Sequence, residues 1–211
     1  MSDPAELYNA ILTGNAKKAE EVTKAAIAAN TNPSDLVQKY MIPAMDEVGR
    51  RFECNEYFVP ELLIAARAMK TALELITPHL VASGAEPMGR VVIGTVQGDL
   101  HDIGKNLVAS MLEGGGFQVV DLGVDVSAEK FVEAAKEKDG TIVALSALLT
   151  TTMTMMKTVI DALQKAGIRS KVKVMIGGAP ITQQYANEIG ADGFSDNASA
   201  AVAVARKLVA K

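Results

Sequence analysis

Apolar residues recur at helical spacing through the first part of the chain. After Pro60 they stand at alternating intervals of four and three, which is typical of a helix that packs along a partner helix. The positions are Leu62, Ala66, Met69, Leu73, Ile76 and Leu80. Pro33 opens an earlier helix, and we expect Pro43 to break or kink it, because proline lacks an amide proton and collides with the preceding turn. Residues 1–82 are therefore predicted to be helical.

The pattern changes after the linker 83–89, which has small residues, Gly and Pro but no periodicity. Short β-branched runs then alternate with helical segments, two of which are expected at 127–138 and 151–166. The runs predict strands at 90–96, 117–122, 141–148, 171–176 and 191–194. Because single helices separate the strands, they must be parallel, with right-handed crossovers.

The predicted fold is α/β with two domains. Residues 1–88 form a helical bundle. Residues 89–211 form a flavodoxin-like (Rossmann-like) domain with a five-stranded parallel sheet in the order 2-1-3-4-5.

Composition narrows the class of partner. The chain has 25 acidic and 21 basic residues, 4% aromatic residues and no Trp, which argues against nucleic-acid binding. No apolar run approaches the roughly 18 residues of a membrane span. The one cysteine, Cys54, cannot form an intramolecular disulfide, so we expect a cytoplasmic protein with neither nucleic acid nor membrane as partner.

Polar loops follow three of the predicted strands. Ligands of an open parallel sheet bind beyond the carboxyl ends of its strands, where the strand order reverses. The first loop holds Asp99, His101 and Asp102, the second offers four hydroxyl groups between 146 and 152, and the third contains the pair Gly177–Gly178. The order 2-1-3-4-5 brings these loops to one edge.

His101 is the candidate metal ligand of that edge. An isolated histidine is more often structural, but this one lies on a glycine-flanked loop with Asp99 and Asp102 beside it. A carboxylate that accepts a hydrogen bond from one ring nitrogen makes the other a better metal ligand. The chain's one cysteine and two histidines cannot supply the ~4 ligands of a closed zinc site. A metal at His101 must therefore bring most of its own coordination, as a macrocycle does.

These residues carry a family resemblance. The segment 99–104, DLHDIG, resembles the D-x-H-x-x-G loop of cobalamin-binding domains. Ser146 and Leu148 resemble the S-x-L element that follows 41 residues later, and Gly177–Gly178 resembles the closing glycine pair after another 28 residues. Segments 45–53 and 56–63 resemble the helical cap of the same family. The chain is thus similar to the corrinoid proteins of methanogen and acetogen methyltransferase systems, which are relatives of the cobalamin region of methionine synthase.

The resemblance implies a cobalamin cofactor, as methylcobalamin or in the Co(I) form. It implies base-off binding with His101 as the axial metal ligand, and with Asp99 and Thr152 completing a hydrogen-bonded relay. Ser146 and Leu148 would contact the detached base. The other cofactor-binding positions that it implies in the α/β domain are Gly98, Asp102, Ile103, Gly104, Thr150, Gly177 and Gly178.

In the cap, the resemblance implies that Phe52, Val59 and Leu62 flank the methyl group; alternatively, these apolar side chains are ordinary bundle core. Asn55 stands where the family usually has glycine. Because Asn is the next best residue at positive φ, the turn is expected to survive.

The function implied is that of a methyl carrier, not of a complete enzyme. It would receive a methyl group from a substrate-specific methyltransferase and present it to a second one, with a reductive activator as a further candidate partner. Methylamines, methanol, glycine betaine and methoxylated aromatics are all candidate donors.

One alternative function is that of the cobalamin-binding subunit of a radical mutase, which needs a barrel partner. Another is a receiver-like regulatory domain, which needs an aspartate at the end of its third strand, where this chain has Ser146-Ala147-Leu148.

Overall fold

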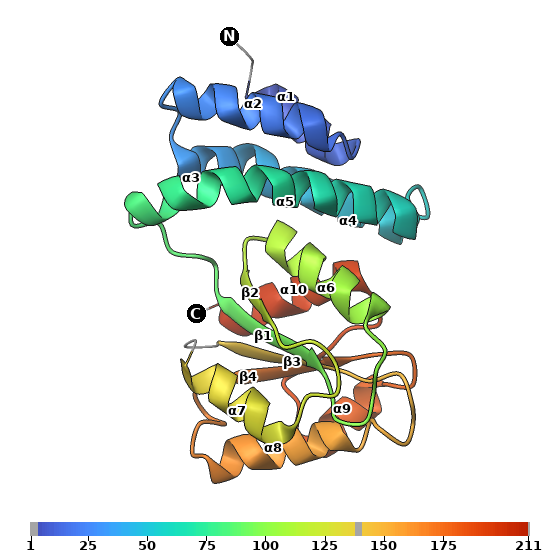
Figure 1. The fold of residues 1–211 in the computed structure, drawn as a ribbon. Coiled ribbons are helices and arrows are strands. Elements are labelled where there is room, and N and C mark those ends of the chain that lie inside the picture. Colours follow the sequence, from blue (N-terminus) through green and yellow to red (C-terminus); the bar gives the residue numbers. More distant parts are fainter. Residues whose placement is uncertain (1–3, 138–140, 211) are drawn as a thin grey trace. The chain divides into compact units, whose positions relative to one another are not determined.

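The computed structural model describes residues 4–137 and 141–210. It contains two compact units, shown in Figure 1. The helical unit comprises Met1–Pro87 and Glu113–Gly116, and the α/β unit comprises Met88–Leu112 and Phe117–Lys211.

The helical unit is built from helices that bury one face each. Its elements are α1 (Ala5–Leu12), α2 (Ala16–Ala28), α3 (Pro33–Leu36), the π-helix η1 (Val37–Met41), α4 (Ile42–Glu53) and α5 (Val59–Ala82). The predicted apolar seam of α5 is buried at Leu62, Ala66, Met69 and Ile76, whereas Leu73 and Leu80 are half-buried. Packing of these side chains against α2 and α4 follows from the 3.6-residue period.

Of the two outcomes expected at Pro43, a break or a kink, the break is wrong. The helical path continues from α3 through η1 into α4, where Pro43 occupies the first turn. The wider hydrogen-bonding pattern of η1 precedes the proline, and such a π-turn absorbs the missing amide and the bulk of the ring without ending the helix. Pro78 likewise lies inside α5. Within residues 4–137 and 141–210, no helix has both the length and the apolarity of a membrane span.

The α/β unit confirms the predicted topology. Its strands are β1 (Arg90–Thr95), β2 (Gln118–Asp121), β3 (Ile142–Ser146), β4 (Lys173–Gly177) and β5 (Gly193–Phe194). They form an all-parallel sheet in the order β2-β1-β3-β4-β5. The helices are α6 (Ile103–Gly114), α7 (Ala128–Glu137), α8 (Met155–Lys165), α9 (Gln183–Ile189) and α10 (Ala198–Val209). Figure 1 shows α7, α8 and α9 on one face of the sheet and α6 and α10 on the other.

The observed start of α8 differs from the predicted helix boundary. The helix expected from Thr151 begins at Met155, because residues 149–154 form tight turns such as Thr152 N–H to Leu149 O at 3.1 Å. The α7 helix is described to Glu137, so its expected end at Lys138 lies outside the described residues.

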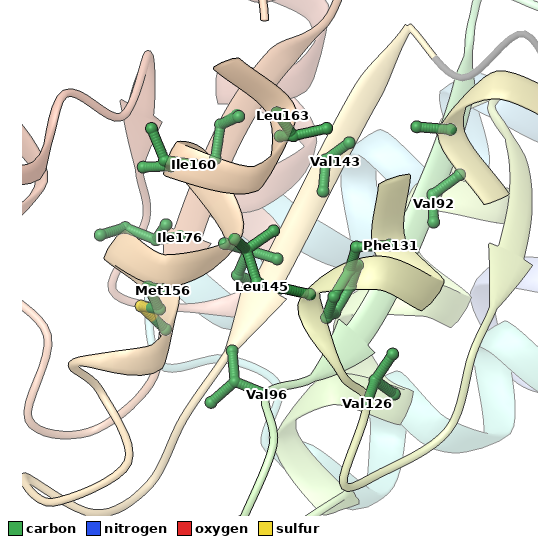
Figure 2. Close-up of a cluster of buried hydrophobic side chains, with 14 of the residues drawn as sticks. Val92, Val96, Val126, Phe131, Val143, Leu145, Met156, Ile160, Leu163 and Ile176 are labelled. Carbon is green, nitrogen blue, oxygen red and sulfur yellow. The ribbon is translucent and has the colours of Figure 1, made fainter. Parts of the chain in front are cut away.

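One hydrophobic cluster fixes the sheet against α7, α8 and α9. Figure 2 shows Val92, Val143 and Leu145 of the sheet beside Phe131 of α7 and Met156 of α8. A Cβ atom on Gly94 would lie 2.8 Å from Cζ of Phe131, so glycine in β1 makes room for that ring. This dry, close-packed layer is the rigid base from which the loops at the carboxyl edge project.

Candidate functional site

The site lies at the carboxyl ends of β1, β3 and β4, which are neighbours in the sheet. Because the strands are parallel, the loops after β1 (96–102), β3 (147–154) and β4 (178–182) leave the sheet at the same edge. The sequence predicts this juxtaposition, and the strand order confirms it.

Asp99 is the centre of the hydrogen-bond network at this edge. Its side chain is 0% exposed. One carboxylate oxygen, Oδ1, accepts from His101 Nδ1 at 2.7 Å and from His101 N–H at 3.1 Å. The other, Oδ2, accepts from Thr152 Oγ1 at 2.7 Å and from Leu148 N–H at 2.8 Å. The buried carboxylate is therefore fully satisfied, as a buried charge must be.

The network keeps Asp99 ionised. Burial raises the pKa of its carboxyl group, but the hydrogen bonds that it accepts, the bond from Thr152 first among them, together outweigh burial. Its pKa therefore lies well below the ordinary value. An ionised carboxylate only accepts hydrogen bonds, so Nδ1 of His101 must be the donor in this contact.

His101 presents its ring to the outside of the edge. The side chain is 52% exposed, and Thr95 Oγ1 holds the backbone by donating to His101 O at 2.8 Å. Because Nδ1 is committed to Asp99, Nε2 of the neutral ring carries the free lone pair. In the described part of the chain, no group of three or more His, Cys, Asp or Glu side chains is placed to hold a metal ion. His101 thus offers one nitrogen ligand, oriented by a buried carboxylate.

Four large apolar side chains stand exposed on the loops that carry this network and at the start of α6. Leu100 and Ile103 are 72% and 80% exposed on either side of His101, and Leu148 and Leu149 are 42% and 43% exposed. Ile103 and Leu148 are predicted site residues, whereas Leu100 and Leu149 were missed. The signal was available, since apolar residues in an otherwise polar loop have no packing reason to be there. Exposed apolar side chains around the free nitrogen of His101 could pack against a large, flat molecule with apolar surface.

Glycine is explained differently at different positions along this edge. A Cβ atom on Gly178, whose φ is +136°, would lie 1.9 Å from Ala147 O, and one on Gly177 would lie 3.2 Å from Ser195 O. Close backbone packing therefore requires glycine at Gly178. At Gly104, by contrast, a Cβ atom would meet nothing within 4 Å. The fold leaves open space there, which a ligand can approach closely.

The other predicted residues of the α/β unit have more ordinary surroundings. Asp102 is exposed, and its carboxylate accepts from Asn106 Nδ2 at 3.1 Å near the start of α6. Ser146 is half-buried at the end of β3, and its carbonyl accepts from Val96 N–H at 3.0 Å. Thr150 is exposed. Direct ligand contacts of these three residues stay predictions.

The predicted residues of the helical unit differ in burial. Leu62 is fully buried, as a core residue is, whereas Val59 is 41% exposed beside Phe58 at 61%. Phe52 is half-buried in α4. Their expected role at a methyl group stays a prediction. Asn55, between α4 and α5, has a φ of 58°, so the prediction that this turn needs positive φ is confirmed.

Comparison with known proteins gives two family matches that cover most of the chain. Residues 89–204 match a model described as a B12 binding domain. Residues 5–77 match a second model with the same description.

Similar proteins are found at full length. Trimethylamine corrinoid protein 2 of Methanosarcina mazei is 45% identical over 201 residues, which are 94% of this chain and 92% of that protein. Dimethylamine corrinoid protein 3 of Methanosarcina acetivorans is 42% identical over 204 residues, 97% of this chain and 95% of that one.

Solved structures agree with these matches. A cobalamin-binding protein from Desulfitobacterium hafniense DCB-2 has a TM-score of 0.81 and 34% identity, and the match covers 100% of both chains. The methanol:cobalamin methyltransferase complex MtaBC from Methanosarcina barkeri contains a chain with a TM-score of 0.85 and 32% identity, with 96% of this chain and 78% of that one covered.

Proposed function

This chain belongs to the B12-binding corrinoid proteins, and we propose that it carries a methyl group between two methyltransferases on a cobalamin held through His101. The observation that carries the proposal is the contact between Nδ1 of His101 and buried Asp99 at 2.7 Å. This contact leaves Nε2 of a half-exposed ring free to bind a metal. Membership of the family is the reason to expect cobalamin. The chain itself offers one oriented nitrogen ligand for its cobalt, Nε2 of His101.

The residues of the edge fit a cobalamin. When bound, the cofactor would supply the chemistry of methyl transfer, because its cobalt would take up a methyl group from a donor and pass it to a nucleophilic acceptor. The corrin ring already provides most of the ligands, so one imidazole from the protein is enough. The exposed side chains of Leu100, Ile103, Leu148 and Leu149 offer apolar contact, and the open space at Gly104 permits close approach.

Asp99 and Thr152 are proposed to set the strength of the axial ligand. A carboxylate that accepts the Nδ1 proton makes Nε2 a stronger donor, and a hydroxyl bonded to that carboxylate lessens the effect. Thr152 Oγ1 also lies 3.0 Å from Leu149 O, so its proton has two acceptors. A shift of that proton would change the charge that the imidazole experiences, which is how the relay is proposed to act.

Base-off binding requires a place for the displaced nucleotide tail. We place it along the backbone of the loops after β3 and β4, where Gly177, Gly178 and Leu148 lie. Ala147 N–H donates to Gly177 O at 3.3 Å, so these loops are joined at their start. Ser146 and Thr150 supply hydroxyl groups in the same region.

The partner proposed first is a substrate-specific methyltransferase. One solved neighbour is a chain of a methanol:cobalamin methyltransferase complex, and full-length relatives are named for trimethylamine and dimethylamine. A methylamine methyltransferase is therefore the first enzyme to test as donor. A second methyltransferase as acceptor and a reductive activator complete the proposed set.

The alternatives have less support. A receiver-like domain needs an aspartate at the end of its third strand, and β3 ends at Ser146. Several similar proteins are named trimethylamine or dimethylamine corrinoid proteins, which favours methyl transfer over a mutase.

The experiment compares His101→Ala with the wild-type protein after loading with hydroxocobalamin. The matched control is His79→Ala, because His79 is an exposed histidine of α5. We expect nitrogen superhyperfine splitting in the EPR spectrum of the cob(II)alamin form of the wild-type and control proteins, and its loss in His101→Ala. Unchanged splitting in His101→Ala would show that another group is the axial ligand.

A further inference from the structure

The loop after β2 contains a residue in an unusual backbone conformation. Asp125 has a φ of 53°, in the left-handed region that non-glycine residues rarely adopt. Gly123, two residues earlier, also has a positive φ, of 83°, which glycine adopts without strain. An outlier kept at a non-glycine residue points to a role for its side chain.

The side-chain carboxylate and the backbone N–H of Asp125 both contact the loop that carries His101. Its carboxylate Oδ1 accepts from Gly98 N–H at 2.7 Å. Its own N–H donates to Asp99 O at 3.0 Å. The two bonds thus hold the dipeptide Gly98–Asp99 at its first amide and its last carbonyl. Gly98 itself has a φ of +82°, so this dipeptide has little conformational preference of its own.

The residue after Asp125 is anchored in the core. Val126 is 2% exposed, its N–H donates to Thr95 O at 3.0 Å, and it forms an isolated parallel bridge with Val96. Figure 2 shows Val126 and Val96 in the hydrophobic cluster. Asp125 therefore connects a rigid layer to the backbone of Asp99.

We propose that Asp125 is a positioning residue for the axial histidine, acting through the backbone of Gly98 and Asp99. Asp99 is held on its side-chain end by Thr152 and Leu148 and on its backbone by Asp125. The side-chain bonds fix the rotation of the carboxylate, and the bonds from Asp125 fix the backbone from which it projects, so together they aim Oδ1 at Nδ1 of His101. The inference deepens the proposed function and rests on it.

Three substitutions separate the parts of this role. Asp125→Asn keeps an acceptor oxygen and tolerates positive φ, so it should behave as the wild type. Asp125→Gly keeps the backbone conformation but removes the acceptor. Asp125→Ala removes the acceptor and adds backbone strain. The comparison of Gly with Asn therefore isolates the hydrogen bond to Gly98.

The first measurement uses the cobalamin-free protein. Long-range proton–nitrogen NMR of ¹⁵N-histidine-labelled protein reports which nitrogen of His101 carries the proton, and the His79→Ala variant assigns the two histidines. We expect the Nδ1–H tautomer in the wild type and in Asp125→Asn. In Asp125→Gly we expect a mixture with the Nε2–H tautomer, while amide signals away from the loops stay in place.

The second measurement is the cobalamin titration. For Asp125→Gly we expect affinity about 10-fold below that of Asp125→Asn, which is typical when a partner of a metal ligand is lost. If Asp125→Gly keeps both the Nδ1–H tautomer and wild-type affinity, the positioning role is overturned, and the axial role of His101 stands. If the wild type itself shows the Nε2–H tautomer, the Asp99–His101 contact fails and the proposed function fails with it.

Discussion

At the scale of single residues, the hydrogen bonds of Asp99 both stabilise a buried charge and orient the ring of His101. Four donors bind its two oxygens. Two of them belong to His101, and the other two belong to Leu148 and Thr152, about 50 residues later in the chain. Removing a donor from such a site costs more than a surface hydrogen bond, because the oxygen left behind stays buried.

The variant Thr152→Val tests this cost. Valine has the same shape but lacks the hydroxyl, so Asp99 Oδ2 keeps only the bond from Leu148 N–H. We expect a loss of about 1–3 kcal/mol in the free energy of unfolding of the cobalamin-free protein, measured with urea. Thr152→Ser is the matched control and should lose much less. Equal stability of the valine variant and the wild type would contradict the role assigned to this bond.

Two glycine variants are expected to separate folding from cofactor binding. Gly178→Ala places a Cβ atom 1.9 Å from Ala147 O at a φ of +136°, so it should destabilise the protein by more than about 2 kcal/mol. Gly104→Ala meets open space and should leave stability unchanged or raise it by about 0.5–1 kcal/mol, because alanine favours the helix.

Urea unfolding of the cobalamin-free variants measures the first effect, and titration with hydroxocobalamin measures the second. We expect Gly104→Ala to bind more weakly although it folds well. Normal binding by this variant would show that no ligand approaches the backbone at Gly104.

The residues of the site differ in how far the sequence predicts them. Asp99, His101 and Thr152 come together as expected, because a recognisable motif places them. Leu100 and Leu149 were missed because apolar residues are normally assigned to the core. Asp125 carries no sequence signal at all, since its role depends on a positive φ and on contact with a loop that lies 27 residues earlier.

At the scale of elements, the turn between α4 and α5 combines a backbone requirement with a charge network. Asn55 has positive φ. Around it, Arg50 contacts Glu47 at 2.7 Å and Glu56 at 3.3 Å, and Arg51 donates to Tyr57 OH at 3.0 Å. These contacts join the end of α4 to the residues that lead into α5.

Substitution of Asn55 tests the backbone part alone. Asn55→Ala should lower the free energy of unfolding by about 1 kcal/mol, because a Cβ-bearing residue without a polar side chain is unfavourable at this φ. Asn55→Gly should be at least as stable as the wild type. Thermal unfolding followed by circular dichroism ranks the three proteins, and an alanine variant as stable as the glycine variant would argue against backbone strain.

The element boundaries that were predicted wrongly share a cause. Periodicity reports which face of a segment is apolar, but not which hydrogen-bond pattern the backbone uses. The helix therefore continues across Pro43 because the π-helix η1 precedes it. Helix α8 begins only at Met155, and Thr152, in the turns before it, donates a hydrogen bond to Asp99. Tertiary contacts decide both, and they are not visible in a local pattern.

At the scale of the whole molecule, each unit contains a carboxyl group whose pKa is lowered by folding. In the helical unit, hydrogen bonds from Arg50 and then Arg51 lower the pKa of Glu47 from 4.5 to about 2. In the α/β unit, the pKa of Asp99 also lies below its ordinary value. Folding favours the ionised form of both groups, so their stabilisation is present above the unfolded-state pKa values and is lost as the pH falls.

The prediction is a loss of stability of the helical unit between about pH 4.5 and pH 2. Three of the four tyrosines, Tyr8, Tyr40 and Tyr57, belong to that unit, so tyrosine fluorescence during urea unfolding follows it. Glu47→Gln should be less stable than the wild type at pH 6 and should lose less on acidification. An identical pH profile for the two proteins would show that Glu47 makes no contribution.

The fold as a whole is largely predictable because single helices between β-branched runs permit few topologies. The parallel direction and the shared carboxyl edge of the loops follow from that rule, and the order 2-1-3-4-5 is one of the common doubly wound orders. The helical unit is predictable in content but not in path, because Pro43 and Pro78 lie within helices that a local rule would end.

The 53-residue separation between Asp99 and Thr152 has a consequence for biosynthesis. During translation the loop with Asp99 and His101 leaves the ribosome well before Thr152 does. Strand β3 must also pair with β1 before Thr152 can contact Asp99. A nascent chain is therefore expected to capture its cofactor only late in translation, after the first helices have had time to fold.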